Sequence, residues 1–145
     1  MAIRNIVKEG EPVLRKTSRS VLNFDDRLAE LIDDMIQTMY EAEGCGLAAP
    51  QVGVLRRVCV IDVGEGPIEL VNPAIINEQG EQNESEGCLS IPGQSGVTKR
   101  PMKVTVKAQD RNGKSFEISG EGLLARALCH EIDHLNGILF KDRLV

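Results

Sequence analysis

The chain has 145 residues, of which 41% are apolar and 27% charged, a balance typical of an ordinary globular domain over residues 1–145. Its net charge of −5 argues against an electrostatic grip on nucleic acid, which needs clustered lysine and arginine. No apolar run approaches the length that spans a membrane, and residues 1–16 lack the uninterrupted apolar segment of a signal peptide. We therefore expect a cytoplasmic protein whose four cysteines are free thiols or metal ligands.

Residues 25–43 predict an amphipathic helix. Asp25 or Asp26 can cap its start, and Gly44 can end it. The apolar positions recur at the spacing of one helix face, namely Leu28, Leu31, Ile32, Met35, Ile36, Met39 and Tyr40. We expect this helix to lie on a hydrophobic core.

The middle of the chain predicts strands joined by short turns. Residues 57–63 contain a continuous apolar run typical of a buried strand, and residues 68–71 can pair with it across a glycine-rich turn. Lys103–Gln109 alternates in polarity, and residues 115–118 follow it across Asn112-Gly113, which is a hairpin signal. Residues 81–86 are polar and predict an exposed loop. Short connections favour antiparallel sheets and an α+β fold.

A second helix is predicted from about residue 121 to residue 136, and it carries the sequence His130-Glu131-Ile132-Asp133-His134. This segment fits H-E-x-x-H. Helical residues four apart lie one turn above each other, so both imidazoles can reach one metal ion. The chain has no other histidine, and the motif therefore predicts a metal centre.

The helical wheel places Glu131 within an apolar stripe, with His130 and His134 at one edge. Members of the stripe are Leu123, Leu124, Ala127, Leu128, Ile132 and Leu135, and opposite lie Arg126, Asp133 and Asn136. A carboxylate on a buried face is costly unless it is paired or neutralised. A proton acceptor beside metal-bound water accounts for Glu131 better than a solvated helix or a purely structural metal site.

A catalytic metal site usually has three protein ligands, and without a third histidine the last must be Cys, Asp or Glu. Cys129 points away from the metal-binding face of its own helix, so we expect it to pack at the helix edge. Chemistry ranks Cys88 first, because Gly87 lets the backbone approach closely and a thiolate binds borderline and soft metals. Cys45 and Cys59 remain open, although Cys59 has the setting of a core residue.

Three segments, in this order along the chain, resemble the motifs of the peptide deformylase family. Residues 44–51 (GCGLAAPQ) resemble G-x-G-x-A-A-P-Q, residues 86–90 (EGCLS) resemble E-G-C-x-S, and residues 130–135 (HEIDHL) resemble H-E-x-D-H-L. Residues 11–15 (EPVLR) also resemble the usual start of the family. The resemblance implies mostly antiparallel sheets packed around the motif-bearing C-terminal helix, with an N-terminal amphipathic helix.

The resemblance implies a reaction and a role for each motif. The reaction is removal of the formyl group from the N-terminal formyl-methionine of new bacterial-type polypeptides. One divalent ion, Fe(II) by family preference with Zn, Ni or Co as replacements, would be held by Cys88, His130 and His134. Glu131 would be the general acid and base, while Gln51 and the backbone N–H of Leu89 would receive the developing oxyanion.

Substrate binding is expected from four further positions. The backbone of Gly46 would hold the extended substrate, and Gly44 lies beside it, although both glycines can equally reflect turn geometry. Ala127 lies near both histidines on the wheel and can line a methionine pocket. Glu86 can contact the substrate backbone at the rim or be solvated. Without the family resemblance, Gln51 would be interpreted as a loop residue that caps backbone groups.

The expected partners are formylmethionyl peptides or nascent chains, with neither nucleic acid nor a membrane. A transient ribosome contact is compatible with such substrates, but the acidic balance gives it no separate support. Two departures from the family are Cys129, where glutamine usually precedes the first histidine, and the end at Val145, where many relatives continue. We expect lost tail contacts there and no lost chemistry.

Two other functions compete with the deformylase. A small zinc peptidase would use the same H-E-x-x-H logic, but a thiolate ligand argues against it. A non-catalytic metal or redox sensor would use Cys88 and the two histidines, but it would not need Glu131 and Gln51.

Overall fold

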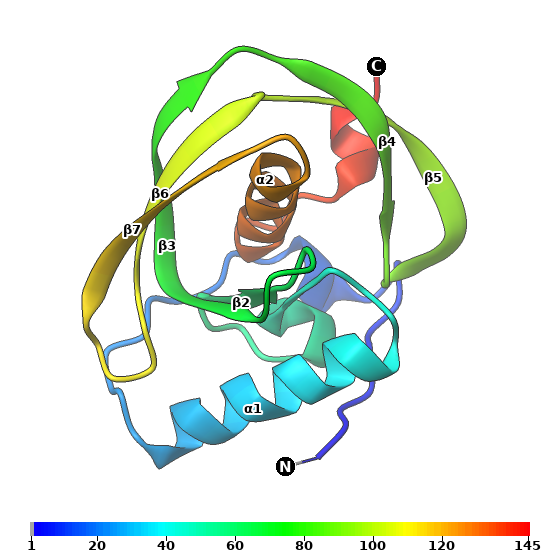
Figure 1. Ribbon diagram of the computed structural model, residues 1–145. Coiled ribbons are helices and arrows are strands. Elements are labelled where there is room, and N and C mark those ends of the chain that lie inside the picture. Colours follow the sequence, from blue (N-terminus) through cyan, green and yellow to red (C-terminus); the bar gives the residue numbers. More distant parts are fainter. Residues whose placement is uncertain (1) are drawn as a thin grey trace.

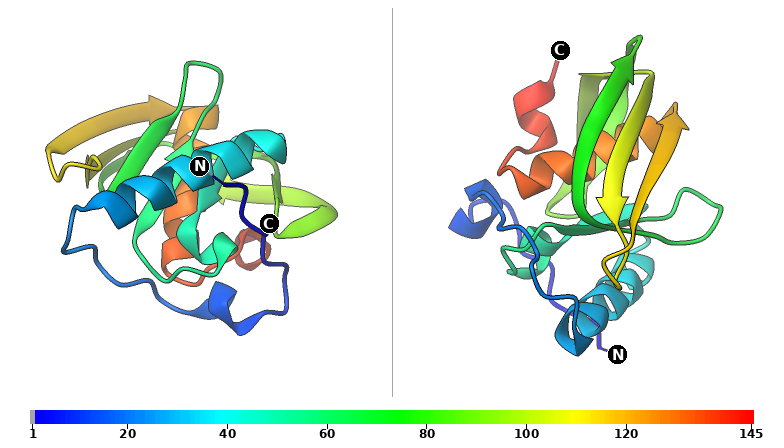
Figure 2. Two further views of the ribbon diagram at one scale, coloured as in Figure 1. Left: turned by 90° about the horizontal axis from the view of Figure 1, so that it is seen from below. Right: turned by 90° about the vertical axis from the view of Figure 1, so that its left-hand side faces the viewer.

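A computed structural model describes residues 2–145 and confirms the α+β class (Figure 1). Two α-helices and three short 3-10 helices are present in this range: η1 Pro12–Arg15, α1 Asp26–Glu41, η2 Ala49–Val52, α2 Leu123–Leu135 and η3 Phe140–Arg143. Helix α2 runs through the middle of the molecule, with strands on both sides of it, whereas α1 lies on the outside (Figures 1 and 2). The functional helix is therefore enclosed by the rest of the chain.

The strands form two antiparallel sheets. Their bounds are β1 Gly46–Ala48, β2 Val58–Ile61, β3 Ile68–Gln79, β4 Gln82–Cys88, β5 Ile91–Arg100, β6 Lys103–Gln109 and β7 Ser115–Glu121. The larger sheet has the order β1-β2-β3-β6-β7, and the smaller one consists of β4 and β5. The expected pairing of residues 68–71 with the first buried strand and the hairpin at Asn112-Gly113 are both confirmed.

Strand β2 is buried on both faces, which explains its continuous apolar run. Cys59 and Ile61 face the core around α2. Val58 and Val60 face the core beneath α1. The alternation of strand side chains thus joins two hydrophobic cores through one short strand, and it confirms Cys59 as a core residue.

Helix α1 forms as its sequence predicts. The Asp25 carboxylate accepts a hydrogen bond from the N–H of Leu28 at 3.0 Å and so caps the first turn. The apolar stripe of the helix packs on β1 and β2. Tyr40 departs from the prediction, because its ring is largely exposed and its hydroxyl donates to Asp62.

Two local predictions are wrong. Residues 81–86 were expected to be an exposed loop, but Gln82–Cys88 is strand β4, in which Gln82 and Glu86 are buried. Leu123 was assigned to the apolar stripe of α2, but it is 57% exposed because it occupies the first position of the helix. Within residues 2–145, neither α-helix is long and apolar enough to cross a membrane.

Candidate active site

Cys88, His130 and His134 come together although 42 or more positions separate the cysteine from the helix pair. The two histidines lie one turn apart on α2, and Cys88 is the last residue of β4. One ligand atom from each residue lies within 4.8 Å of the others. The Sγ atom of Cys88 is 3.4 Å from Nε2 of His134. The structure thus assembles the three residues ranked first from the sequence.

This donor set fits one divalent cation. A thiolate and two imidazoles are ligands that borderline metals prefer, and three protein ligands are typical of catalytic sites. Burial, together with the nearby charge of His130, holds the pKa of His134 well below its usual value. His134 is therefore neutral, which is the form of imidazole that binds a metal.

Glu131 lies beside the donor set and is buried as predicted. Its Oε2 atom is 4.0 Å from Nε2 of His130, and no group among residues 2–145 donates a hydrogen bond to its Oε1 atom. Burial raises the pKa of Glu131 to about 7. A carboxyl group with this pKa can both accept and release a proton near neutral pH.

Gly46 provides the space that Glu131 occupies. A Cβ atom on Gly46 would lie 2.3 Å from Oε2 of Glu131, which is closer than any real contact. Turn geometry does not explain this glycine, since Gly46 is the first residue of β1 and is paired with Ile61. The close approach of strand and carboxylate is therefore the physical reason for glycine here.

The Gln51 amide also faces the donor set. Its Oε1 atom accepts a hydrogen bond from the N–H of Ala48 at 3.0 Å, so the loop-capping alternative is also present. Its Nε2 atom donates to the Ser90 hydroxyl at 3.1 Å and lies 3.6 Å from Sγ of Cys88. The capping bond orients the amide so that its nitrogen points at the thiol.

A cavity of about 430 Å³ opens beside these groups. Its lining contains all the positions expected to contact substrate, namely Gly44, Gly46, Gln51, Glu86, Leu89 and Ala127. A Cβ atom on Gly44 would lie 2.7 Å from Cδ1 of Leu89, so a larger residue here would have to displace the Leu89 side chain. Leu123 lines the cavity too, which gives its exposed side chain a place at the site.

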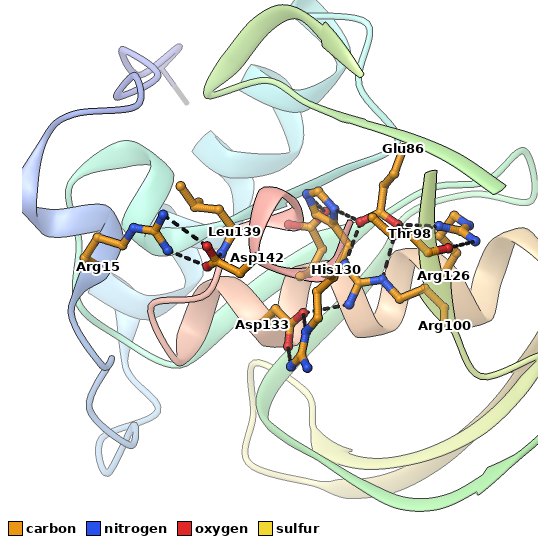
Figure 3. A network of polar contacts seen from close by, with 11 residues as sticks. Arg15, Glu86, Thr98, Arg100, Arg126, His130, Asp133, Leu139 and Asp142 are labelled. Carbon is orange, nitrogen blue, oxygen red and sulfur yellow. Dashed lines mark hydrogen bonds and ion pairs between the residues drawn. The ribbon is translucent and has the colours of Figure 1, made fainter. Parts of the chain in front are cut away.

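Glu86 departs from one of the two alternatives that the sequence left open. It is only 7% exposed, so the prediction of a solvated side chain is wrong. Its Oε1 atom lies 2.6 Å from Nδ1 of His130 and accepts from Arg100 at 2.6 Å. Its Oε2 atom accepts from Thr98, Arg100 and Arg126 (Figure 3). A contact between Glu86 and substrate stays a prediction.

The partners of Glu86 were missed by sequence reasoning. Burial alone would raise the pKa of Glu86, but the hydrogen bonds that it accepts, first of all from His130, hold that pKa well below its usual range. Arg126 and Asp133 were placed opposite the apolar stripe, and both are nevertheless buried. Their spacing of seven residues puts them on one helix face, and this was the available signal.

The remaining cysteines lie apart from the ligand set. Cys129 is buried at the edge of α2, as expected, and burial raises the pKa of its thiol to about 11. Cys45 lines the cavity and is exposed. Neither belongs to the cluster of ligand atoms, which resolves the choice of the sulfur in favour of Cys88.

Comparisons with known proteins agree with this geometry. The family model described as polypeptide deformylase matches residues 3–145. A peptide deformylase of Alkaliphilus metalliredigens is 63% identical over 145 residues, covering all of this chain and 99% of that protein. The peptide deformylase of Caldicellulosiruptor bescii is 59% identical over 145 residues, covering all of this chain and 87% of the relative.

Solved structures are similar over the same length. The peptide deformylase of Thermotoga maritima superposes with a TM-score of 0.98 at 42% identity, covering all of this chain and 99% of that one. The enzyme of Legionella pneumophila gives a TM-score of 0.96 at 53% identity, covering 99% of this chain and 87% of that one. The chain belongs to the polypeptide deformylase family.

Proposed function

We infer that this protein removes the formyl group from the N-terminal formyl-methionine of nascent polypeptides, with residues 1–145 acting as one deformylase domain. The observation that carries the inference is the donor set of Cys88, His130 and His134, with the buried carboxyl of Glu131 beside it at a cavity. Membership of the deformylase family gives this arrangement its substrate.

Cys88, His130 and His134 would hold one divalent ion. When bound, such an ion polarises the formyl carbonyl and lowers the pKa of a water molecule. We propose Fe(II) as the native ion, because the family prefers it, and Zn, Ni and Co suit the same donors. Elemental analysis of anaerobically purified protein, together with the oxygen sensitivity of its activity, identifies the ion.

Glu131 would move the proton. As a carboxylate it accepts a proton from the attacking water, and as an acid it returns that proton to the amine that leaves the formyl carbon. Its pKa of about 7 supports both halves of this cycle near neutral pH. Its Oε1 atom also supports the role, because no group among residues 2–145 donates to it and would have to be displaced first.

Gln51 and the backbone N–H of Leu89 would stabilise the negative charge that develops on the formyl oxygen. The orientation of the Gln51 amide supports this role, because its nitrogen lies 3.6 Å from Sγ of Cys88. An amide that is already held by Ala48 and Ser90 needs little reorganisation during the reaction.

The substrate would lie along β1. Among the described residues this strand pairs with β2 alone and is therefore an edge of the larger sheet, which leaves the backbone of Gly46 free to hold an extended peptide. Gly44 and Ala127 would leave room for the methionine side chain in the cavity, and Glu86 lies at its wall.

We further propose a cytoplasmic location and a transient ribosome contact, since nascent chains are the substrate.

The decisive assay compares matched peptides. The metal-loaded protein is incubated with formyl-Met and acetyl-Met forms of one tripeptide, and the released formate or acetate is measured with the peptide products. We expect formate from the first peptide, little acetate from the second and no cleavage of internal peptide bonds. Internal cleavage with the formyl group retained would contradict the inference and favour a peptidase.

A further inference from the structure

The C-terminal segment makes a polar contact with the helix that carries the metal ligands. Arg143, at the end of η3, donates from Nη2 to Oδ1 of Asp133 at 3.0 Å and from Nε to Oδ2 at 3.1 Å. Asp133 lies on α2 directly before His134. The carboxylate of Asp133 is buried, whereas the Arg143 side chain is 45% exposed and covers it from outside.

From Asp133 the contacts continue to the metal centre. Arg100 donates from Nη1 to Oδ2 of Asp133 at 2.6 Å and from Nη2 to Oε1 of Glu86 at 2.6 Å. The same Oε1 atom lies 2.6 Å from Nδ1 of His130 (Figure 3). Four side chains from η3, α2, β5 and β4 thus form an unbroken polar path from the chain end to a metal-binding imidazole.

Arg143 matters in this path because Arg100 serves two carboxylates at once. Within residues 2–145, the only hydrogen bond to Oδ1 of Asp133 comes from Arg143. If Arg143 is removed, Asp133 keeps Arg100 as its one strong partner and competes with Glu86 for it. Glu86 then holds the His130 ring less firmly, and the partners that orient a ligand imidazole set metal affinity.

We propose that Arg143 is a positioning residue of the metal centre, acting through Asp133, Arg100 and Glu86 on the orientation of His130. The proposal rests on the metal set given under the proposed function. Arg143 itself touches neither the substrate cavity nor the ligand atoms. Its side chain is 45% exposed, whereas the Asp133 carboxylate is 12% exposed and keeps Arg100 as a second charged partner.

The chain offers a matched control in Arg15. Arg15 pairs with Asp142, the neighbour of Arg143 on η3, at 2.5 Å and with a similarly exposed side chain. Figure 3 shows this pair to one side of the Glu86 network, without a link to Asp133. Arg15→Ala and Arg143→Ala therefore each remove one half-exposed arginine from an ion pair of η3 or its neighbour α2, with carboxylates that are 41% exposed in Asp142 and 12% exposed in Asp133. Only Arg143→Ala interrupts the path to His130.

The experiment measures metal affinity, the stability of the metal-free protein and steady-state kinetics for the wild type, Arg143→Ala, Arg143→Lys and Arg15→Ala. Affinity is measured with Zn(II) against a competing chelator, and the visible spectrum of the Co(II) form reports ligand geometry. For Arg143→Ala we expect about a tenfold weaker metal affinity, a changed Co(II) spectrum, a lower kcat and an unchanged KM. Arg143→Lys should recover part of the affinity, and Arg15→Ala should match the wild type in all but the melting temperature.

Weaker metal binding and a changed Co(II) spectrum in Arg143→Ala alone, with both metal-free alanine variants folded at the assay temperature, would support the proposal. An affinity and Co(II) spectrum of Arg143→Ala that match the wild type would overturn it. So would an equal loss of affinity in Arg15→Ala. If the wild type binds metal no better than Cys88→Ala, the metal set itself fails and the role of Arg143 falls with it.

Discussion

Glu131 on α2 and Glu86 on β4 are two buried carboxyl groups that flank the same imidazole, His130. Both oxygens of Glu86 are engaged by donors, and these hydrogen bonds hold its pKa well below the usual range. Glu131 has an oxygen to which no described residue donates, and burial raises its pKa to about 7. The same chemical group is thus a charged anchor at Glu86, where its partners are complete, and our proposed proton carrier at Glu131, where they are missing.

The largest effect is expected when Glu131, the carboxyl group that lacks hydrogen-bond partners, is made neutral. Glu131→Gln keeps the shape of the side chain but cannot accept a proton, so we expect kcat to fall by about 10²–10⁴-fold. Metal content should stay near that of the wild type, since Glu131 is outside the ligand set. Formate release under single-turnover conditions measures the effect, and a variant with more than a tenth of wild-type turnover would remove Glu131 from the proton transfer.

Removal of the Glu86 carboxylate, whose hydrogen-bond partners are complete, should lower folding stability more directly than catalysis. Glu86→Ala leaves Arg100 and Arg126 buried without their shared carboxylate, and breaking a buried ion pair in this way costs about 3–5 kcal/mol. Urea unfolding of the metal-free protein measures this loss. Glu81→Ala, which removes an exposed pair with Lys99, is the control and should have little effect. Equal losses in the two variants would contradict the anchoring role.

The comparison becomes sharper at Gln51, which combines an anchored oxygen with a nitrogen directed at the site. Gln51→Ala should keep the fold and the metal but lose about 10²–10³-fold in kcat, or about 2.7–4 kcal/mol of transition-state stabilisation. Parallel measurements of kcat, KM and metal content test this. Full activity would exclude Gln51 from the mechanism.

Gly46→Ala tests whether the position of Glu131 matters as much as its charge. The added methyl group would lie 2.3 Å from Oε2 of Glu131 and must displace the carboxylate. A displacement of about 1 Å costs on the order of 10²-fold in rate. We expect such a loss in kcat with a normal metal content, and wild-type kcat would show that the carboxylate position is not critical.

The smallest expected effect is a pH-dependent difference in stability. In the metal-free protein the pKa of Glu131 rises on folding from 4.5 to about 7, so the folded state binds the extra proton between these values. This group therefore makes the protein less stable as pH rises through that window. Glu131→Gln removes the effect, and the melting temperature of the variant should exceed that of the wild type by a few degrees above pH 7. The gain should shrink as the pH falls toward 4.5, and a constant difference across this range would contradict the assignment.

Sequence patterns over a few neighbouring residues were sufficient to predict many of the elements of this molecule. Helical periodicity predicted α1 and α2 to within a few residues at each end, and Asn112-Gly113 predicted the β6–β7 hairpin. The H-E-x-x-H spacing predicted that His130 and His134 share one helix face. Thiolate chemistry beside Gly87 ranked Cys88 first, and the family motifs agreed with that choice. Each of these inferences uses residues that are close in sequence, or a motif whose context is already known.

Only the tertiary structure decided which charged groups are buried. Residues 81–86 have the composition of a loop, yet Glu86 is buried. Its carboxylate is held by Arg100 and His130, which lie 14 and 44 positions further along the chain. Leu123 is apolar yet exposed, because it begins its helix at the cavity mouth. Periodicity reports which faces a segment has, but the burial of a charge depends on partners that distant elements supply.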